Sequence, residues 1–338
     1  MINIATVPDE NLSQTLRLMK GEFIKRGWEA ELAYIGSPHC FVDRKDGSKK
    51  LHVFSATPPT TSYAAASLAN DKYGTFELLK TANIPQLDSF LASEHTTFEE
   101  QVAFMQEHGK VVVKPVDGGH GKGITVNVDT PEKLRDAIVE ANANRKSIDA
   151  SIIQKQYLHD TILDIRILCI DYEFVAATWR VPARVYGNGV NTVRELIDQE
   201  NLSEHRGRPY YAKLASIDTV KAAQYLGDAI DTVPKQDEMV FVLGIANYGA
   251  GGETVDITNE IPSWLKDVAI LASKTSGLAV AGVDFMLSKV PTKDSTFEEL
   301  DAMLIEINKC PLLAIHDTPT SGTPRDTVGH YVDYLAGL

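Results

Sequence analysis

The chain of 338 residues is 43% hydrophobic, which is enough to bury one large core or two to three smaller ones. Its formal net charge of −13 argues against nonspecific binding to nucleic acid or to an anionic membrane, because both require a basic face. Three widely separated cysteines support neither a disulfide framework nor a paired-cysteine zinc site, and no signal peptide or membrane-length apolar run is visible. We therefore expect a globular cytoplasmic protein, and whether it forms a homo-oligomer stays open.

Residues 1–70 predict a small α/β domain with no chemistry of its own. The expected elements are a strand at 2–7, a helix at 12–25, a strand at 28–35 and a hairpin-like core at 51–55. The first three of these elements suggest a βαβ unit.

A helix is predicted over 70–85, because the stretch NDKYGTFELLKTANIP begins with capping residues and stops at Pro85. Lys72 lies at the start of this helix. Taken alone, a lysine in that position is most simply a solvated side chain.

An apolar strand that carries a lysine, KVVVKPVDGGHGKG, then runs directly into a glycine-rich loop. Its β-branched valines favour a strand that delivers Lys114 to its end, where Pro115 stops further ladder pairing. The loop glycines permit close backbone approach to an anion, and Lys122 adds positive charge; these glycines are Gly118, Gly119, Gly121 and Gly123. The spacing matches neither Walker A nor the dinucleotide pattern, and an ordinary strand-to-turn corner would use the same residues. The loop alone therefore leaves a polyphosphate site and a plain turn both open.

Alternating strands and helices are predicted for the rest of the chain. The expected strands are at 124–128, 151–154, 162–170, 173–181, 278–287 and 302–308, the helices at 131–142, 220–226 and 261–276, and a polar insertion or lid at 201–234. The last helix should turn Val268, Leu271 and Ala272 inward.

Two arginines lie on the strands around a predicted turn at Asp171 and Tyr172, Arg166 before it and Arg180 after it. Because a charge is costly to bury alone, each arginine either points to solvent or faces an anion or a carboxylate.

The last two apolar strands carry three strongly polar residues, Asp284, Glu306 and Asn308. Glu306 and Asn308 share a face, because side chains on a strand alternate with a period of two. Carboxylate and amide oxygens are ligands that Mg²⁺ prefers. The strands therefore predict a metal site, and their apolar flanks argue against a solvent-facing edge.

From about residue 70 onward, a series of ordered segments resembles the ATP-grasp family, especially cyanophycin synthetases and the ATP-grasp half of bifunctional glutathione synthetases. The segments are NDKYGTFELLK, KVVVKPVDGGHGKG, QKQYLHD, RVPARVYGNGVNTVRELI, NYGAGGETVDIT and the tail NKCPLLAIHDTPTSGTPRDTVGHYVDYL. Three positions depart from the pattern: Gln154 replaces a usual glutamate, and Leu243 and Ala314 replace usual arginines.

The resemblance implies an α/β ATP-grasp fold, in which subdomains at 71–153 and 154–338 clamp ATP after the domain at 1–70. The ATP contacts that it implies are Lys72, Lys114, Gly118, Gly119, Gly121, Lys122, Gln154, Tyr157 and, for the ribose, Asp164. Two Mg²⁺ ions, with Mn²⁺ as the alternative metal, are implied at Asp284, Glu306 and Asn308. The implied catalytic residues are Arg180, His120 and Arg166, and the implied substrate-binding residues are Arg184, Asn247, His316 and Arg325.

The implied activity is ATP-dependent formation of an amide or peptide bond between an amino acid or peptide carboxylate and an amine, through an acyl-phosphate. Leu243 and Ala314 leave open an ATP-binding regulatory module without turnover. A phosphotransferase is a further alternative.

Overall fold

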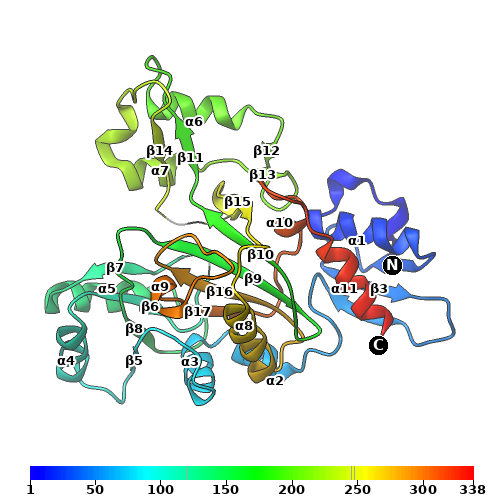
Figure 1. Ribbon diagram of the computed structural model, residues 1–338, viewed down its shortest axis with the longest axis horizontal. Coiled ribbons are helices and arrows are strands. Elements are labelled where there is room, and N and C mark those ends of the chain that lie inside the picture. The colour runs from blue at the N-terminus through cyan, green and yellow to red at the C-terminus, as the bar shows by residue number, and fades with distance from the viewer. Residues whose placement is uncertain (120, 245, 247) are drawn as a thin grey trace. The chain divides into compact units, whose positions relative to one another are not determined.

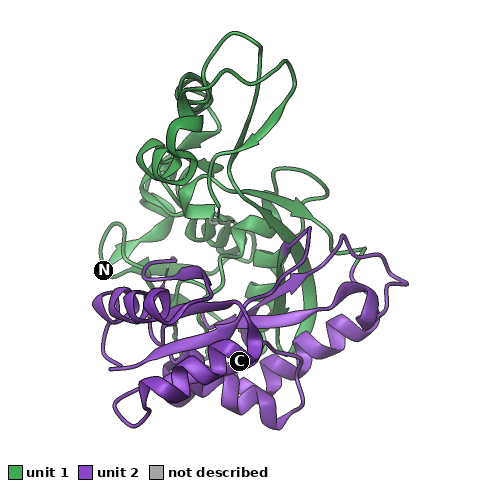
Figure 2. Cartoon of the chain, turned by 90° about the vertical axis from the view of Figure 1, so that its left-hand side faces the viewer, with its two compact units in different colours: residues 1–59, 164–260, 310–338 green, residues 60–163, 261–309 purple. Residues whose placement is uncertain are grey.

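A computed structural model describes residues 1–338 except residues 120, 245 and 247. The chain forms two compact units, and each is assembled from separate chain segments (Figure 2). Unit 1 comprises residues 1–59, 164–260 and 310–338, and unit 2 comprises residues 60–163 and 261–309. Within the described residues, no helix is long and apolar enough to cross a membrane. The domain boundaries expected at 70 and 153 stay predictions.

The N-terminal part of unit 1 is an antiparallel sheet in the order β1-β2-β3-β4 with two long helices. Its elements are β1 (Ile2–Asn3), α1 (Gln14–Lys25), β2 (Glu29–Leu32), β3 (His39–Asp43), β4 (Leu51–Phe54) and the C-terminal α11 (Thr327–Ala336). The βαβ prediction is wrong, because β1 is only two residues long and pairs antiparallel with β2. Helix α1 packs against α11, and Arg26 pairs with Asp333 across this contact. Arg44 also donates to the Leu335 carbonyl at 3.1 Å and the Ala336 carbonyl at 2.8 Å, at the C-terminal end of α11.

A second sheet in unit 1 contains the antiparallel strands β9 (Leu163–Ile170), β10 (Glu173–Val181) and β15 (Glu253–Asp256). Asp171 and Tyr172 join β9 and β10 with φ values of +54° and +60°, as a two-residue hairpin turn requires. This hairpin confirms the sequence prediction. The register places Asp164 opposite Arg180 and Arg166 opposite Thr178.

The rest of unit 1 packs around two small apolar clusters, one that includes Val185 and Val242 and one formed by Leu214, Tyr248 and Ile315. Its elements are β11 (Arg184–Tyr186), α6 (Val193–Asn201), β12 (Arg206–Gly207), β13 (Leu214–Ala215), α7 (Thr219–Leu226), β14 (Met239–Phe241) and α10 (Ala314–Asp317). The helix predicted at 220–226 is thus confirmed as α7, and it lies inside the expected polar insertion.

Unit 2 contains an antiparallel sheet in the order β5-β8-β6-β7 and a β-hairpin with its own helices (Figure 1). The elements are α2 (Tyr63–Leu68), α3 (Lys72–Thr81), β5 (Ser89–Ala92), α4 (Phe98–His108), β6 (Val111–Pro115), β7 (Thr125–Val128), α5 (Pro131–Ala143), β8 (Ser151–Lys155), α8 (Ser263–Ser276), β16 (Val280–Leu287), α9 (Phe297–Leu300) and β17 (Met303–Asn308). Met105 of α4 and Leu134 of α5 bury against Val111 and Val113 of β6. Strand β6, which carries Lys114, is therefore held by backbone pairing with β7 and β8 and by apolar packing against α4 and α5.

Helix α8 packs against β16 and α3 through a stripe that includes Leu265, Ala269 and Ala272. The expectation that Leu271 faces inward is wrong, since 43% of this residue is exposed. The buried positions are spaced four and three residues apart, which turns position 271 toward solvent.

Candidate active site

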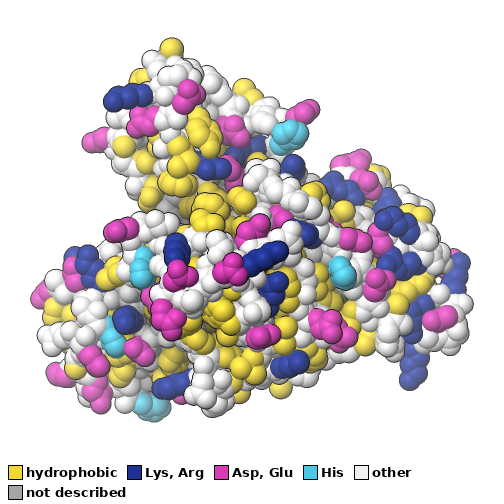
Figure 3. All heavy atoms as spheres, in the orientation of Figure 1, with side chains coloured by type: hydrophobic (Ala, Val, Ile, Leu, Met, Phe, Trp, Pro, Cys, Tyr) yellow, Lys and Arg dark blue, Asp and Glu magenta, His cyan; other side chains and the backbone are white. Residues whose placement is uncertain are grey.

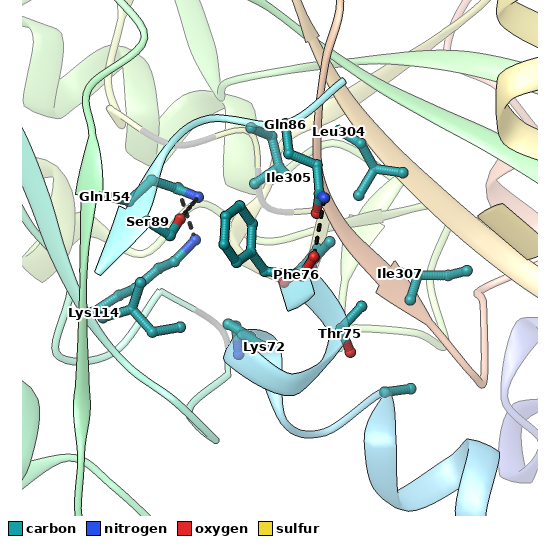
Figure 4. A pocket seen from close by; sticks show the side chains of 13 residues that line it. Lys72, Thr75, Phe76, Gln86, Ser89, Lys114, Gln154, Leu304, Ile305 and Ile307 are labelled. Atoms are coloured by element: carbon teal, nitrogen blue, oxygen red, sulfur yellow. Dashed lines mark hydrogen bonds between the residues drawn. The ribbon is translucent and has the colours of Figure 1, made fainter. Parts of the chain in front are cut away.

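A pocket in unit 2 is lined by residues of α3, β6, β8 and β17 (Figure 4). Lys114 of β6 points at Gln154 of β8, and its Nζ donates to Gln154 Oε1 at 2.9 Å. Gln154 pairs with Val112, two residues before Lys114, so the ladder register places both side chains on one face. The Gln154 amide in turn donates to Ser89 Oγ at 3.0 Å. Lys114 is thereby held in one orientation inside the protein.

Burial dominates the electrostatics of Lys114, of which only 6% is exposed. It lowers the pKa of Lys114 to about 8, against the opposing attraction of the Glu306 carboxylate. The ammonium group of Lys114 has thus lost most of its contact with water, and a nearby anion would stabilise its charged form.

Lys72 reaches the same pocket from the first residue of α3. Asp71 caps the helix by accepting from the Gly74 amide at 2.8 Å, and the Lys72 amide donates to the Val116 carbonyl at 3.1 Å. The Lys72 Nζ donates to the Gly118 carbonyl at 2.5 Å. Burial lowers the pKa of Lys72, while the Glu306 carboxylate raises it. Lys72 is therefore no ordinary solvated lysine, because its ammonium group touches the glycine-rich loop.

The glycine-rich loop itself lies between β6 and β7. Gly118 and Gly119 are partly buried, whereas Gly121 and Lys122 are exposed. The Lys122 amide donates to the Gly119 carbonyl at 3.3 Å, which closes a turn. Two expected residues, His120 of this loop and Asn247, lie outside the described residues.

Sequence reasoning missed Asp117, the residue that opens the loop. Its buried carboxylate accepts from the backbone amides of Lys146 at 2.9 Å, Ser147 at 2.6 Å and Ile148 at 3.0 Å, and from Ser147 Oγ at 2.8 Å. Burial pushes the pKa of Asp117 up, but these hydrogen bonds outweigh it and hold the pKa well below its usual range. The available signal was an aspartate directly before two glycines, a composition typical of side-chain-to-backbone turns.

The three expected metal ligands also lie together in unit 2. Asp284 of β16 stands directly opposite Glu306 of β17, and Asn308 follows on the same strand. The Asn308 Nδ2 donates to Asp284 Oδ2 and to Glu306 Oε1, both at 3.3 Å. The donor set suits Mg²⁺, because turning the amide over presents a third oxygen to the space between two carboxylates. Within the described residues, no group of three His, Cys, Asp or Glu side chains forms a metal site.

The expected catalytic and substrate arginines belong to unit 1. Arg166 is buried, and Arg180 Nε donates to Asp164 Oδ1 at 2.9 Å. Neither arginine therefore takes the solvent-facing alternative. Asp164, expected at the ribose, is the partner of Arg180 in this structure. The pairing follows from their opposite positions on β9 and β10.

Two further arginines hold carboxylates of β15 that the sequence did not single out. Arg184 Nη2 lies 2.8 Å from Glu253 Oε2. Arg325 donates two hydrogen bonds to Asp256, from Nε to Oδ1 at 3.0 Å and from Nη2 to Oδ2 at 2.6 Å. Each of these ion pairs raises the pKa of its guanidinium. Both arginines are thus oriented by a carboxylate rather than extended into solvent.

The remaining expected residues are buried. His316 lies on α10, and its carbonyl accepts from the Arg325 amide at 2.9 Å. The Tyr157 hydroxyl donates to the Asp301 carbonyl at 2.8 Å, and burial raises its pKa. Leu243 and Ala314 are 4% and 0% exposed, so apolar side chains fill the two positions where arginines were expected.

Comparison with known proteins agrees with this architecture. Residues 80–203 match the family described as the ATP-grasp domain of prokaryotic glutathione synthetase. The structure is similar to that of a bifunctional glutathione synthetase from Pasteurella multocida, with a TM-score of 0.70 and 23% identity over 98% of this chain and 44% of that chain. The chain has the ATP-grasp fold. This confirms the α/β fold class expected from the sequence.

Among curated relatives, a cyanophycin synthetase from Synechocystis sp. is 33% identical over 79% of this chain and 30% of its own length. The bifunctional glutathione biosynthesis protein GshAB from Clostridium perfringens is 27% identical over 96% of this chain and 41% of its own length. The chain thus spans less than half the length of these relatives. By their chemistry, the lysines of unit 2 suit a phosphate chain and its carboxylates suit Mg²⁺.

Proposed function

We propose that this chain is an ATP-dependent ligase that joins an amino acid or peptide carboxylate to an amine and releases ADP and phosphate. The observation that carries the proposal is the convergence of Lys72, Lys114 and the metal-ligand candidate Glu306 in one pocket, where the carboxylate acts electrostatically on both ammonium groups. A triphosphate with its metal needs this combination of cations and oxygen ligands.

In the proposed reaction, a substrate carboxylate oxygen attacks the γ-phosphorus of ATP, and the bond to the β,γ-bridging oxygen breaks to release ADP. The amine then attacks the acyl-phosphate carbon, phosphate leaves with the bond electrons, and the amine gives up a proton. Lys72 and Lys114 hold the phosphate chain, and the 117–123 loop covers its end. Asp284, Glu306 and Asn308 would hold two Mg²⁺ ions, with Mn²⁺ as the alternative, and the metal would neutralise phosphate charge.

Arg180 is proposed to stabilise the oxyanion that forms when the amine attacks. Its support is the ion pair with Asp164, which fixes the guanidinium, and its place at the start of RVPARVYGNG. Arg166, Arg184 and Arg325 are proposed for substrate carboxylates, because a guanidinium matches a carboxylate with two parallel hydrogen bonds. His316 is proposed for the same role through a single ring N–H. The proposed location is the cytoplasm, where free amino acids and ATP are available.

Charge on the surface is consistent with small-molecule substrates. On the face that Figure 3 shows, Lys and Arg side chains of the described residues are interspersed with Asp and Glu, without a continuous basic area. A local phosphate pocket therefore fits this chain better than a nucleic-acid surface.

The test is phosphate release across a panel of amino acids and dipeptides, with product masses. The proposal expects amine-dependent phosphate release, trapping of a hydroxamate by hydroxylamine, and transfer of ¹⁸O from the substrate carboxylate to phosphate. ATP binding without amine-dependent release would indicate a regulatory module, and label in AMP would indicate adenylation.

A further inference from the structure

The segment between α5 and β8 packs against both ends of the glycine-rich loop. At the loop entry, Asp117 accepts the amides of Lys146, Ser147 and Ile148. At the loop exit, Gly123 has a φ of +70°, and a Cβ on it would lie 2.7 Å from Asn144 Cβ. The loop base is therefore closed by residues 144–148, which sequence motifs did not single out.

This contact fixes the backbone of Lys146 beside the entry of the glycine-rich loop. Asp117 binds Lys146, and the next residue, Gly118, accepts the Lys72 ammonium group at 2.5 Å. Ile148 is anchored in an apolar cluster with Val116 and Ile152, so the segment is held from a second side. The ammonium group of Lys72 and the backbone amide of Lys146 thus bind consecutive residues of the loop, Gly118 and Asp117.

The side chain of Lys146 carries a charge and is exposed. Both Asp117 oxygens accept hydrogen bonds from residues 146–148, and within the described residues Lys146 forms no ion pair. Lys146 is exposed, yet after burial and Glu306 its positive charge is the next cause that acts on the pKa of Lys72, and it lowers that pKa. The neighbouring Arg145 differs, because it pairs with Asp149 at 2.7 Å. Lys146 therefore acts on Lys72 together with the carboxylates of Glu306, Asp117 and Asp71, which places its ammonium group within electrostatic range of Lys72.

We propose that Lys146 is a further phosphate-binding residue, positioned by Asp117 at the base of the glycine-rich loop. The inference rests on the proposed nucleotide binding at Lys72 and Lys114 and adds a cation from a segment outside the motifs. The matching ligand is the phosphate chain of a nucleoside triphosphate.

The test is calorimetric titration of the full chain with ATP and Mg²⁺ and, separately, with adenosine. For Lys146→Ala we expect ATP affinity to fall about 5- to 20-fold, as for one partly solvated charge-assisted bond, with adenosine affinity unchanged. Arg145→Ala is the matched control and should leave both affinities unchanged. Asp117→Asn should weaken ATP binding, and its effect should not add to that of Lys146→Ala, because both act on the same contact.

The outcomes separate the two levels of the argument. Unchanged ATP affinity in Lys146→Ala, or equal losses in Lys146→Ala and Arg145→Ala, would overturn the role of Lys146 while leaving nucleotide binding intact. A folded wild-type chain that binds no ATP would instead overturn the proposed function and this inference together. Fully additive effects of Asp117→Asn and Lys146→Ala would remove Asp117 as the positioning residue.

Discussion

Replacing Lys114 by methionine should affect folding and nucleotide binding differently. The buried charge of Lys114 lowers the stability of the fold, whereas the same charge favours the binding of ATP. The pKa of Lys114 falls from 10.5 to about 8 on burial, which corresponds to roughly 3 kcal/mol of charging cost in the folded protein at neutral pH. The variant loses the donor to Gln154 Oε1, a loss of about 1–3 kcal/mol. The free energy of unfolding should therefore stay unchanged or rise by up to about 2 kcal/mol.

ATP binding should respond in the other direction. Loss of one charge-assisted hydrogen bond is worth about 1.5–3 kcal/mol, or about 10- to 150-fold in affinity. Urea unfolding and ATP calorimetry at pH 7 measure both quantities, and Lys133→Met is the control, since Lys133 is a solvated lysine paired with Asp129. Wild-type ATP affinity in Lys114→Met would refute the reasoning, and so would a loss of more than about 3 kcal/mol of unfolding free energy.

Three further variants test the remaining sites. Glu306→Gln should raise the Mg²⁺ concentration needed for half-maximal phosphate release by at least about 10-fold, and an unchanged Mg²⁺ dependence would exclude this carboxylate as a ligand. Arg180→Ala should lower kcat by roughly 10²–10³ with a smaller effect on ATP affinity; a loss confined to ATP affinity would contradict the oxyanion role. Burial raises the pKa of Asp317 from 3.8 to about 6, so its charged form destabilises the fold above pH 6, and this penalty disappears as the pH falls toward 4. Asp317→Asn should therefore raise the melting temperature at pH 7 and not at pH 4, and an equal gain at both pH values would argue against titration as the cause.

The spacing of apolar residues predicted those helices and strands that bury one face and are bounded by turn or capping residues. The β9–β10 hairpin followed from alternation on both sides of Asp171 and Tyr172, and α7 followed from its apolar spacing. The direction of β1 was not predictable, because two residues carry no pattern that distinguishes parallel from antiparallel pairing. The error at Leu271 had a similar origin, since several apolar residues on one helix define more than one inward stripe.

The site residues that were found carry a motif, and those that were missed depend on tertiary contacts. Lys114, Glu306 and Asn308 were visible because a charged or polar residue inside an apolar strand is unusual. Asp117 was not visible, since its partners are backbone amides about thirty residues further along the chain. Asp256 was missed for the same reason, because its guanidinium partner comes from a distant segment.

The packing of α1 against α11 has a consequence for biosynthesis. A ribosome makes α1 long before α11, so the surface of α1 that α11 covers stays open until α11 has emerged. Unit 1 cannot close until residues 310–338 have emerged, although unit 2 has all of its segments by residue 309. Such long-range closure slows folding and leaves apolar surface available to chaperones or to other nascent chains. Substitutions at Arg26 or Arg44 should therefore affect the yield of folded protein in cells before they affect its activity.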